Sequence, residues 1–319
     1  MPLTTDKQIL ATSEALVTDL RAAFHTPETD RPAHARGHLL RGTFTPTPLA
    51  ATLSTAPHFN NPTTPLLARF SSSTGLPQIP DTDPSANPRG LAIRFLLSAD
   101  GHSHTDIITH SSPLFPARTG EAFLSLVHAL ASGDPATIAA FMAANPAAAA
   151  FRARPNPSPA SFASQPYFGI HAFFLRAPDG ARTPVRYRLA PAEPTHVLSD
   201  AELAGKSPSY LFDELRTHGR MSFALQAQVG APEDPTDDST QQWPEEREVV
   251  ELGRVEFDEV LGEEEDGEVA KRVIFDPVPR VEGVEASADP LIEVRAAVYL
   301  ISGRIRREAE GGGCPVMKN

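Results

Sequence analysis

Hydrophobic positions change their spacing several times along the chain, and each change predicts a different kind of element. Residues 5–24 carry apolar side chains at near-helical spacing, which predicts an N-terminal helix. Short runs rich in β-branched and aromatic residues follow between clusters of proline, glycine and aspartate, and such runs are typical of strands. The predicted strands are 37–47, 65–72, 90–98, 105–111, 169–176, 183–189, 221–229, 248–258 and 269–275.

Helical spacing returns in the middle of the chain and near its end. It predicts helices over 121–131, 135–150, 199–203, 207–216 and 290–307. Ser199 and Ser207 suit the N-caps of two of these helices. Pro290 suits the first turn of the last one, because the N–H that proline lacks would have no partner there. The acidic run 262–267 is interpreted as a solvated hairpin tip between two strands.

This order of elements excludes one common architecture and favours another. Several strands follow one another before the next long helix, and no glycine-rich phosphate loop follows a strand, so a doubly wound nucleotide-binding fold is excluded. The pattern predicts an α+β fold in which helices surround an antiparallel β-barrel. We expect a single domain over residues 1–310 and a flexible tail over 311–319, where three consecutive glycines provide no anchor.

Composition narrows the classes of partner and the location. The 319 residues include 28 Lys and Arg against 40 Asp and Glu, a net charge of −12, which argues against binding to nucleic acid or to an anionic membrane surface. The single cysteine, Cys314, excludes an internal disulfide. The sequence has neither a secretory signal nor an unbroken apolar segment of membrane-spanning length, so we expect a soluble, cytoplasmic protein.

Two small motifs could carry chemistry. His34 precedes a predicted strand and has the pKa range of a general base, although a structural histidine is the commoner use of such a position. Arg295 and Tyr299 are spaced i,i+4 on the last predicted helix, so the guanidinium would lie beside the phenol and favour its ionised form. A phenolate is one of the ligands by which proteins hold haem iron, but the spacing alone is weak evidence for such a site.

Three histidines leave a different kind of site open. On a strand, His102 and His104 would share one face, as a mononuclear metal site requires, and His110 follows six residues later. The acidic ligand expected downstream is absent. A non-haem metalloprotein built on these histidines therefore remains an alternative.

Motifs in a fixed order connect these weak signals. They include His34-Ala35-Arg36-Gly37, Ala68-Arg69-Phe70-Ser71, Asn87-Pro88-Arg89-Gly90, the stretch 112–123 with Phe115 and Phe123, the stretch 167–173, Trp243-Pro244, Phe275-Asp276-Pro277, residues 283–287, and Arg295-x3-Tyr299 followed by Arg306. In this order the motifs resemble those of the haem catalase family over residues 30–307. The resemblance implies a catalase-type barrel with a haem pocket between the barrel and the C-terminal helix.

The resemblance assigns the haem ligands and the residues that would hold the haem edge. Tyr299 would bind the iron of haem b, and Arg295 would keep the phenol ionised. Arg31, Arg69 and Arg306 would pair with the haem propionates, because a guanidinium matches a carboxylate in a bidentate geometry.

The resemblance also assigns the distal side. His34 would be the distal base, which moves a proton between the two peroxide oxygens, and Ser71 would hold its tautomer by a hydrogen bond. Phe115 and Phe123 would pack near the porphyrin and exclude water. His110 stands where the family carries a distal asparagine that helps to hold a second peroxide, so efficient catalase turnover is not expected.

His110 and the short length of the chain favour the small catalase-related peroxidases within the family. The chain lacks the long arm and the C-terminal helical region that interlock subunits of full-size catalases, so we expect an assembly such as a homodimer. The predicted function is the reduction of hydrogen peroxide or organic hydroperoxides by a small organic donor, with weak catalase activity. Alternatives are a fatty-acid hydroperoxide isomerase similar to allene oxide synthases, which carry Thr where this chain has Ala33, and a haem carrier without activity.

Overall fold

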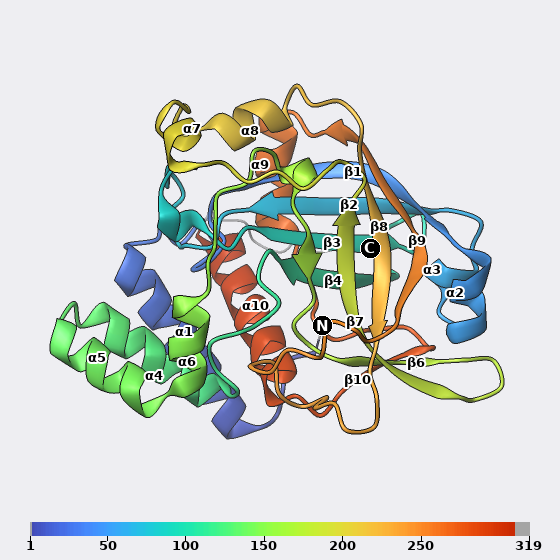
Figure 1. Ribbon diagram of the computed structural model, residues 1–319, viewed down its shortest axis with the longest axis horizontal. Coiled ribbons are helices and arrows are strands. Elements are labelled where there is room, and N and C mark those ends of the chain that lie inside the picture. Colours follow the sequence, from blue (N-terminus) through green and yellow to red (C-terminus); the bar gives the residue numbers. More distant parts are fainter. Residues whose placement is uncertain (1, 310–319) are drawn as a thin grey trace, which may run out of the picture.

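An antiparallel β-barrel forms the centre of the fold, and the computed structural model describes it with its flanking elements over residues 2–309 (Figure 1). Eight strands follow one another around the barrel in the order β7-β5-β4-β3-β2-β1-β9-β8, and pairing of β7 with β8 closes it. The strands are β1 Gly37–Pro46, β2 Thr64–Ser71, β3 Gly90–Leu96, β4 His104–His110, β5 Tyr167–Phe168, β7 Arg182–Pro191, β8 Met221–Val229 and β9 Val249–Val260. Two further strands, β6 Phe173–Arg176 and β10 Val284–Ala286, extend the sheet beyond β7. The predicted antiparallel barrel is confirmed.

The barrel interior is a packed aromatic core. Side chains alternate between the interior and the outer face along each strand, and the inward positions of several strands carry fully buried phenylalanines. Phe44 and Phe95, for example, meet edge to face with ring centres 5.2 Å apart. Because side chains fill the barrel, its interior has no room for a ligand, and a functional site has to lie on its outer face or at its ends.

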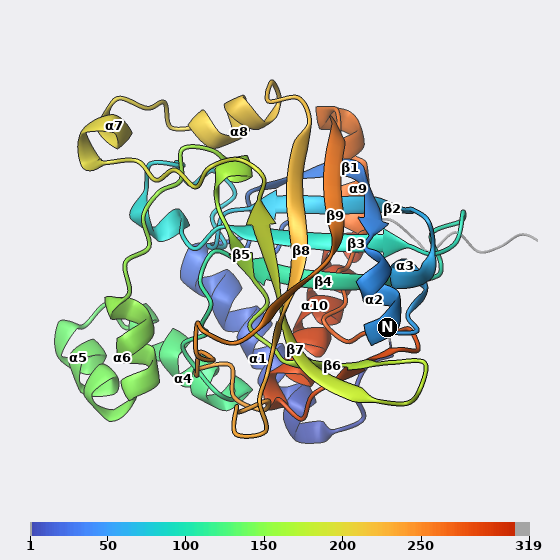
Figure 2. The ribbon, with the colours of Figure 1, turned by 45° about the vertical axis from the view of Figure 1, so that its right-hand side comes forward.

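Three long helices pack together beside the barrel. They are α1 Lys7–Phe24, α4 Gly120–Ala131 and α10 Pro290–Glu308, and they share an apolar cluster of Leu16, Leu20, Val127 and Val294 (Figure 2). The smaller helices are α2 Pro48–Leu53, α3 Pro57–Asn60, α5 Pro135–Ala144, α6 Pro146–Ala153, α7 Asp200–Ala204, α8 Tyr210–Leu215 and α9 Glu263–Arg272, with 3₁₀ turns at Pro84–Ala86 and Phe162–Ser164.

The N-terminus of α10 begins as its sequence predicts. Pro290 occupies the first turn, and the Asp289 side chain accepts a hydrogen bond of 2.9 Å from the Leu291 backbone N–H. The cap and the proline fix where this helix starts, and therefore which of its residues face the barrel.

The predicted hairpin tip at 262–267 and the predicted strand 269–275 are wrong, because α9 occupies most of this region. Four acidic residues, 263–266, form the first turn of α9, and Lys271 and Arg272 lie in the last. This arrangement complements the helix dipole. The Asp266 carboxylate also accepts a hydrogen bond of 2.7 Å from the Leu39 backbone N–H, which ties α9 to β1. The acidic residues of this run therefore favour the start of a helix and do not mark a solvated loop.

Smaller differences have equally local causes. The predicted helix 135–150 is two helices, because Pro146 lacks the N–H that a continuous helix would need. Helix α8 begins after Ser209 rather than after Ser207, and the Ser209 side chain makes no cap hydrogen bond. The strand predicted from 169 begins only at Phe173. The predicted tail 311–319 lies outside the described residues.

Membrane insertion through a helix has no support in the described part of the chain. None of the helices within residues 2–309 combines the length and the apolar character needed to cross a bilayer.

Buried His58 makes the stability of the fold depend on pH. Its ring lies in the aromatic core, 4.0 Å from the Phe59 ring centre, and its Nδ1 has no hydrogen-bond partner. Burial lowers the pKa of His58 to about 3. The unfolded chain therefore binds a proton near pH 6.5 while the folded chain does not, so stability is lost as the pH falls from 6.5 towards 3.

The substitution His58→Phe should remove this part of the acid sensitivity. Below pH 6 the loss of unfolding free energy should be smaller than in the wild type by about 1.4 kcal/mol per pH unit, measured by urea denaturation at several pH values. His102→Phe is the control, because the His102 side chain is exposed in the folded chain. Parallel pH profiles for wild type and His58→Phe would contradict this account.

Candidate active site

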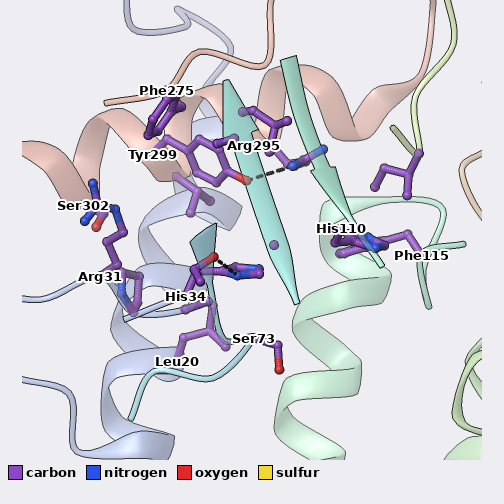
Figure 3. Close-up of a pocket in the computed structure, with 18 of the residues that line it drawn as sticks. Leu20, Arg31, His34, Ser73, His110, Phe115, Phe275, Arg295, Tyr299 and Ser302 are labelled. Atoms are coloured by element: carbon purple, nitrogen blue, oxygen red, sulfur yellow. Dashed lines mark hydrogen bonds between the residues drawn. The ribbon is translucent and has the colours of Figure 1, made fainter. Parts of the chain in front are cut away.

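A cavity of about 390 Å³ lies between the outer face of the barrel and α10 (Figure 3). The sequence-predicted site residues come from the loop before β1, from β2 and β4, from the loop before α4 and from α4 and α10, yet all ten line this cavity. They are Arg31, His34, Arg69, Ser71, His110, Phe115, Phe123, Arg295, Tyr299 and Arg306. The structure therefore brings every one of them together.

Strand register aligns the polar residues of the barrel side. Ser71 ends β2 and pairs with Gly90 at the start of β3, which in turn pairs with His110 at the end of β4. Two residues further along the same outer face, Arg69, Ala92 and Ile108 form the next row. The ends of three adjacent strands thus present a serine, a glycine and a histidine side by side to the cavity.

Gly90 leaves room for the groups next to it. A Cβ at this position would lie 2.7 Å from Ser71 Oγ and 2.9 Å from His34 Nδ1, both too close for ordinary contact. His34 Nδ1 and Ser71 Oγ are hydrogen-bonded at 3.0 Å. The glycine is therefore what allows the imidazole and the hydroxyl to meet across the end of the strand.

The loop that carries His34 is held in an unusual backbone conformation. His34 has φ of +56°, in the left-handed region that non-glycine residues rarely adopt. Its N–H donates to the Ser73 carbonyl at 3.1 Å, and the Arg69 guanidinium donates to the His34 and Ala35 carbonyls at 2.8 and 2.9 Å. Together these hydrogen bonds hold the turn in place. A strained backbone conformation persists in a folded protein only where its surroundings hold it in this way.

Burial keeps the His34 imidazole uncharged at neutral pH. It lowers the pKa of His34 to about 3, helped by the positive charges of Arg69, Arg295 and Arg31. When Nδ1–H donates to Ser71 Oγ, the lone pair of the ring lies on Nε2. The site then holds a neutral imidazole with a free acceptor nitrogen.

Tyr299 and Arg295 form a pair on the opposite wall. Both lie on α10, one turn apart, and Arg295 donates to the Tyr299 hydroxyl from Nη2 at 2.9 Å and from Nε at 3.3 Å. Figure 3 shows the Tyr299 ring and the His34 imidazole facing the same space from two sides. A phenolate oxygen would be stabilised here by two charge-assisted hydrogen bonds.

Three arginines gather at one end of the cavity without acidic partners. Among the described residues, none of Arg31, Arg69 and Arg306 has a carboxylate within 4.0 Å; their hydrogen bonds go to backbone carbonyls and to Ser302. Burial, followed by repulsion from Arg69, lowers the pKa of Arg31 well below its usual value. Burial likewise lowers the pKa of Arg69 to about 10 and that of Arg306 to about 9. The buried Nε atoms of Arg69 and Arg306 have no partner, so the cluster can accept a ligand with more than one negative charge.

His110 faces the cavity as a hydrogen-bond donor. The Ser112 backbone N–H donates to its Nδ1 at 3.1 Å. Burial lowers the pKa of His110 to about 3, so the ring is neutral and its proton lies on Nε2. Nearby, the rings of Phe115 and Phe123 meet with centres 4.9 Å apart and form an apolar wall.

A buried ion pair fixes the segment between α9 and α10. On the outer face of β3 and β4, Arg94 and Asp106 are paired at 2.7 Å. Arg94 also donates to the Ile274 carbonyl, and Asp106 accepts a bond of 2.7 Å from the Asp276 N–H. The segment they hold contributes Phe275 to the cavity and supplies the Val273 carbonyl that binds Arg31 and Arg306.

Reasoning from the sequence missed a second pair behind Tyr299. His171 Nδ1 lies 2.7 Å from Asp289, the residue that caps α10, and both side chains are buried. The buried His171 Nε2 has no hydrogen-bond partner within residues 2–309, and both His171 and Arg295 line a void of about 10 Å³, large enough for about one water. His171 was noticed only as part of a sequence block; its pairing with Asp289 depends on contacts over 118 residues, which spacing cannot reveal.

The alternative metal site on the three histidines is contradicted. His102 lies on the turn before β4, and His104 and His110 lie at opposite ends of that strand, about 20 Å apart at 3.3 Å per residue. Within residues 2–309, no group of three or more His, Cys, Asp or Glu side chains is placed to hold a metal ion. The three histidines cannot meet at one ion because six residues of extended strand separate His104 from His110.

Comparison with protein families and known relatives agrees with this geometry. The family model described as Catalase matches residues 6–316. A "Catalase-related peroxidase" of Mycolicibacterium paratuberculosis is 36% identical over 290 residues, which cover 88% of this chain and 90% of that relative. Another, of Synechococcus elongatus, is 30% identical over 303 residues and covers 91% of this chain and 87% of its own length.

Solved structures share the fold. A fungal catalase superposes with a TM-score of 0.73 at 23% identity, over 87% of this chain and 59% of the catalase. Catalase A from Saccharomyces cerevisiae superposes with a TM-score of 0.72 at 21% identity, over 90% of this chain and 64% of its own length. The chain thus spans less than two thirds of these two catalases.

Adding a methyl group at Gly90 should disturb the His34–Ser71 pair. Gly90→Ala should lower the free energy of unfolding by about 1–3 kcal/mol, because the new Cβ overlaps both partners. Urea denaturation measures the change. Gly169→Ala is the matched control, since its Cβ would lie 3.4 Å or more from its neighbours. Equal effects of the two substitutions would show that the close packing at Gly90 is not what matters.

Proposed function

The chain belongs to the catalase family and is a peroxide-acting oxidoreductase, and from this premise we propose that it binds haem b in the cavity and works as a peroxidase. The substrates would be hydrogen peroxide or organic hydroperoxides, and a small organic donor would supply the electrons. Each turnover takes one hydroperoxide, two electrons and two protons to water and an alcohol, or to two waters. The observation that carries the proposal is the buried arginine cluster on the same cavity as Tyr299 and His34.

The residues of the cavity fit haem in charge and in chemistry. Haem b carries two propionates, and the cluster of Arg31, Arg69 and Arg306 offers buried guanidinium groups that lack carboxylate partners in the described chain. Guanidinium and carboxylate groups form the strongest bidentate pairs. Apart from these groups and the polar residues already described, the walls are mostly aliphatic and aromatic, as a porphyrin requires.

Tyr299 would hold the iron of the haem through its phenolate oxygen. When bound, haem supplies an iron that exchanges electrons with the peroxide and with the donor. Arg295 would direct two hydrogen bonds to this phenolate oxygen. His171, a buried neutral imidazole paired with Asp289, lines the same small void as Arg295.

His34 would move the proton that cleavage of the peroxide requires. Its neutral Nε2 accepts the proton of one peroxide oxygen and delivers it to the other, which then leaves as water or alcohol. Ser71 holds the proton of the ring on Nδ1 and so keeps Nε2 available. The strained turn places the imidazole before the substrate arrives, which avoids an ordering cost during the reaction.

His110 would distinguish this site from that of a catalase that turns over two peroxides. Its Nε2–H can donate one hydrogen bond to a peroxide oxygen, but the imidazole has no amide oxygen to accept one. This difference supports peroxidase turnover with weak catalase activity. The homodimer, the identity of the donor and the cytoplasmic location stay predictions.

Two substitutions on opposite walls separate cofactor binding from proton transfer. His34→Ala should keep the haem spectrum but lower the second-order rate constant with hydrogen peroxide by about 10²-fold or more, as the loss of a general acid–base group does. Tyr299→Phe should lose or strongly shift the Soret band, because the iron loses its anionic ligand. Absorption spectra after reconstitution and stopped-flow mixing with peroxide measure both effects.

Matched substitutions outside the cavity are the controls. His128 is bonded to Asp19 on the surface, and the Tyr210 hydroxyl donates to the Pro159 carbonyl. His128→Ala and Tyr210→Phe should therefore leave the spectrum and the rate unchanged. A wild-type rate in His34→Ala, or a wild-type spectrum in Tyr299→Phe, would remove that residue from the proposed function.

A further inference from the structure

The α5–α6 hairpin is only weakly packed against the rest of the molecule. In both ribbon views it lies at the periphery, next to α4 (Figures 1 and 2). None of the ten residues of α5 is buried, and Ala148 is the only buried residue of α6. Segments with so little buried apolar surface open at a low free-energy cost. The hairpin can therefore move without disturbing the barrel.

One side chain of this hairpin reaches the haem-sized cavity. Within 135–153, Phe151 alone lines it, and its ring is neither fully buried nor fully exposed. Phe115 and Phe123, which also line the cavity, belong to the loop before α4 and to α4 itself. A weakly packed helix thus contributes an aromatic group to the cavity.

Hydrogen bonds connect the chain that follows α6 to the loop that carries His34. The chain just after α6 is held by Asn87, whose Nδ2 donates to the Asn156 carbonyl at 3.2 Å and to Ser158 Oγ at 3.3 Å. The Asn87 carbonyl accepts from Ser73 Oγ at 3.0 Å, and the Ser73 carbonyl accepts from the His34 N–H. Both Ser73 and Asn87 line the cavity. The chain that follows the hairpin is therefore tied to the loop that carries His34.

We infer that Phe151 is a specificity-determining residue, which limits the size of the organic group on the hydroperoxide that reaches His34. Hydrogen peroxide is small enough to pass the ring, whereas a hydroperoxide with an aryl or branched alkyl group has to displace it together with α6. The apolar side chains that line the cavity favour such apolar substituents once the ring has moved. This inference rests on the proposed function, because it concerns access to the same site.

Truncation of the ring tests the inference directly. In haem-loaded protein, Phe151→Ala should raise the second-order rate constant with cumene hydroperoxide by about tenfold or more, and should change that with hydrogen peroxide by less than about twofold. Phe151→Trp should lower the cumene hydroperoxide constant. Stopped-flow absorbance gives the constants of the wild type and of both variants. Because Phe151 lies on a peripheral helix, neither substitution reaches the core, and an unchanged Soret band checks that the site is intact.

A measurement without turnover gives an independent readout. Imidazole and 4-phenylimidazole binding to the ferric protein can be measured from their spectral shifts. In the wild type 4-phenylimidazole should bind more slowly than imidazole. In Phe151→Ala the two rates should be similar. Phe141→Ala is the matched control, because Phe141 lies on the same hairpin and is equally half-exposed but does not line the cavity. Phe141→Ala should keep the wild-type ratio of the two peroxide rate constants and the wild-type ratio of the two imidazole binding rates.

The outcomes separate the two proposals. If neither peroxide reacts with the wild type, the proposed function fails. If both react, but Phe151→Ala leaves the cumene hydroperoxide constant unchanged or lowers it, the role of Phe151 is refuted. A gain of equal size in Phe141→Ala also refutes it, because the effect would then come from loosening the hairpin and not from the ring.

Discussion

Buried positive charge without a directly paired carboxylate is the constraint on which the site depends. Taking a guanidinium group out of water costs several kcal/mol unless its N–H groups are satisfied. The fold satisfies them partly with backbone carbonyls, and two of these carbonyls belong to the turn that carries His34. Arg69 thus serves two ends: it is part of a charge cluster that awaits an anionic ligand, and it holds the imidazole in its left-handed turn. Charge placement and catalytic geometry are consequences of the same hydrogen bonds.

The inner face of the sheet forms the packed core of the barrel, and its outer face carries residues of the site. The interior of the barrel is filled by interlocking rings, and this packing fixes the strand register. The register then aligns Ser71, Gly90 and His110 on the outer face. The Arg94–Asp106 pair on the same face holds the segment before α10 by hydrogen bonds to its backbone. A rigid wall results on the barrel side of the cavity. Phe151 of the barely buried hairpin lines the same cavity, so the site combines fixed chemistry with adjustable access.

Sequence reasoning predicted what depends on local order and missed what depends on long-range contacts. The i,i+4 spacing placed Arg295 beside Tyr299, and strand patterning gave most of the barrel. The pairing of His34 with Ser71 rested on family resemblance, because only register brings residues 37 positions apart together. The pairing of His171 with Asp289 left no local signal, and α9 was missed because a charge run was interpreted as solvent-exposed loop when it favours a helix N-terminus. The histidine metal site failed because His104 and His110 lie at opposite ends of one extended strand, about 20 Å apart.

The central claim is that the arginine cluster is completed by the two propionates of one haem. Titration of the ligand-free protein with haem and with haem dimethyl ester, which lacks both negative charges, tests it most directly. Absorbance gives the stoichiometry and affinity of each, and urea denaturation gives the change in stability. The account predicts one equivalent of haem, a gain in unfolding free energy on binding, and an affinity for the ester at least about tenfold weaker, the effect of losing about 1.4 kcal/mol. Equal affinities for haem and its ester would contradict it.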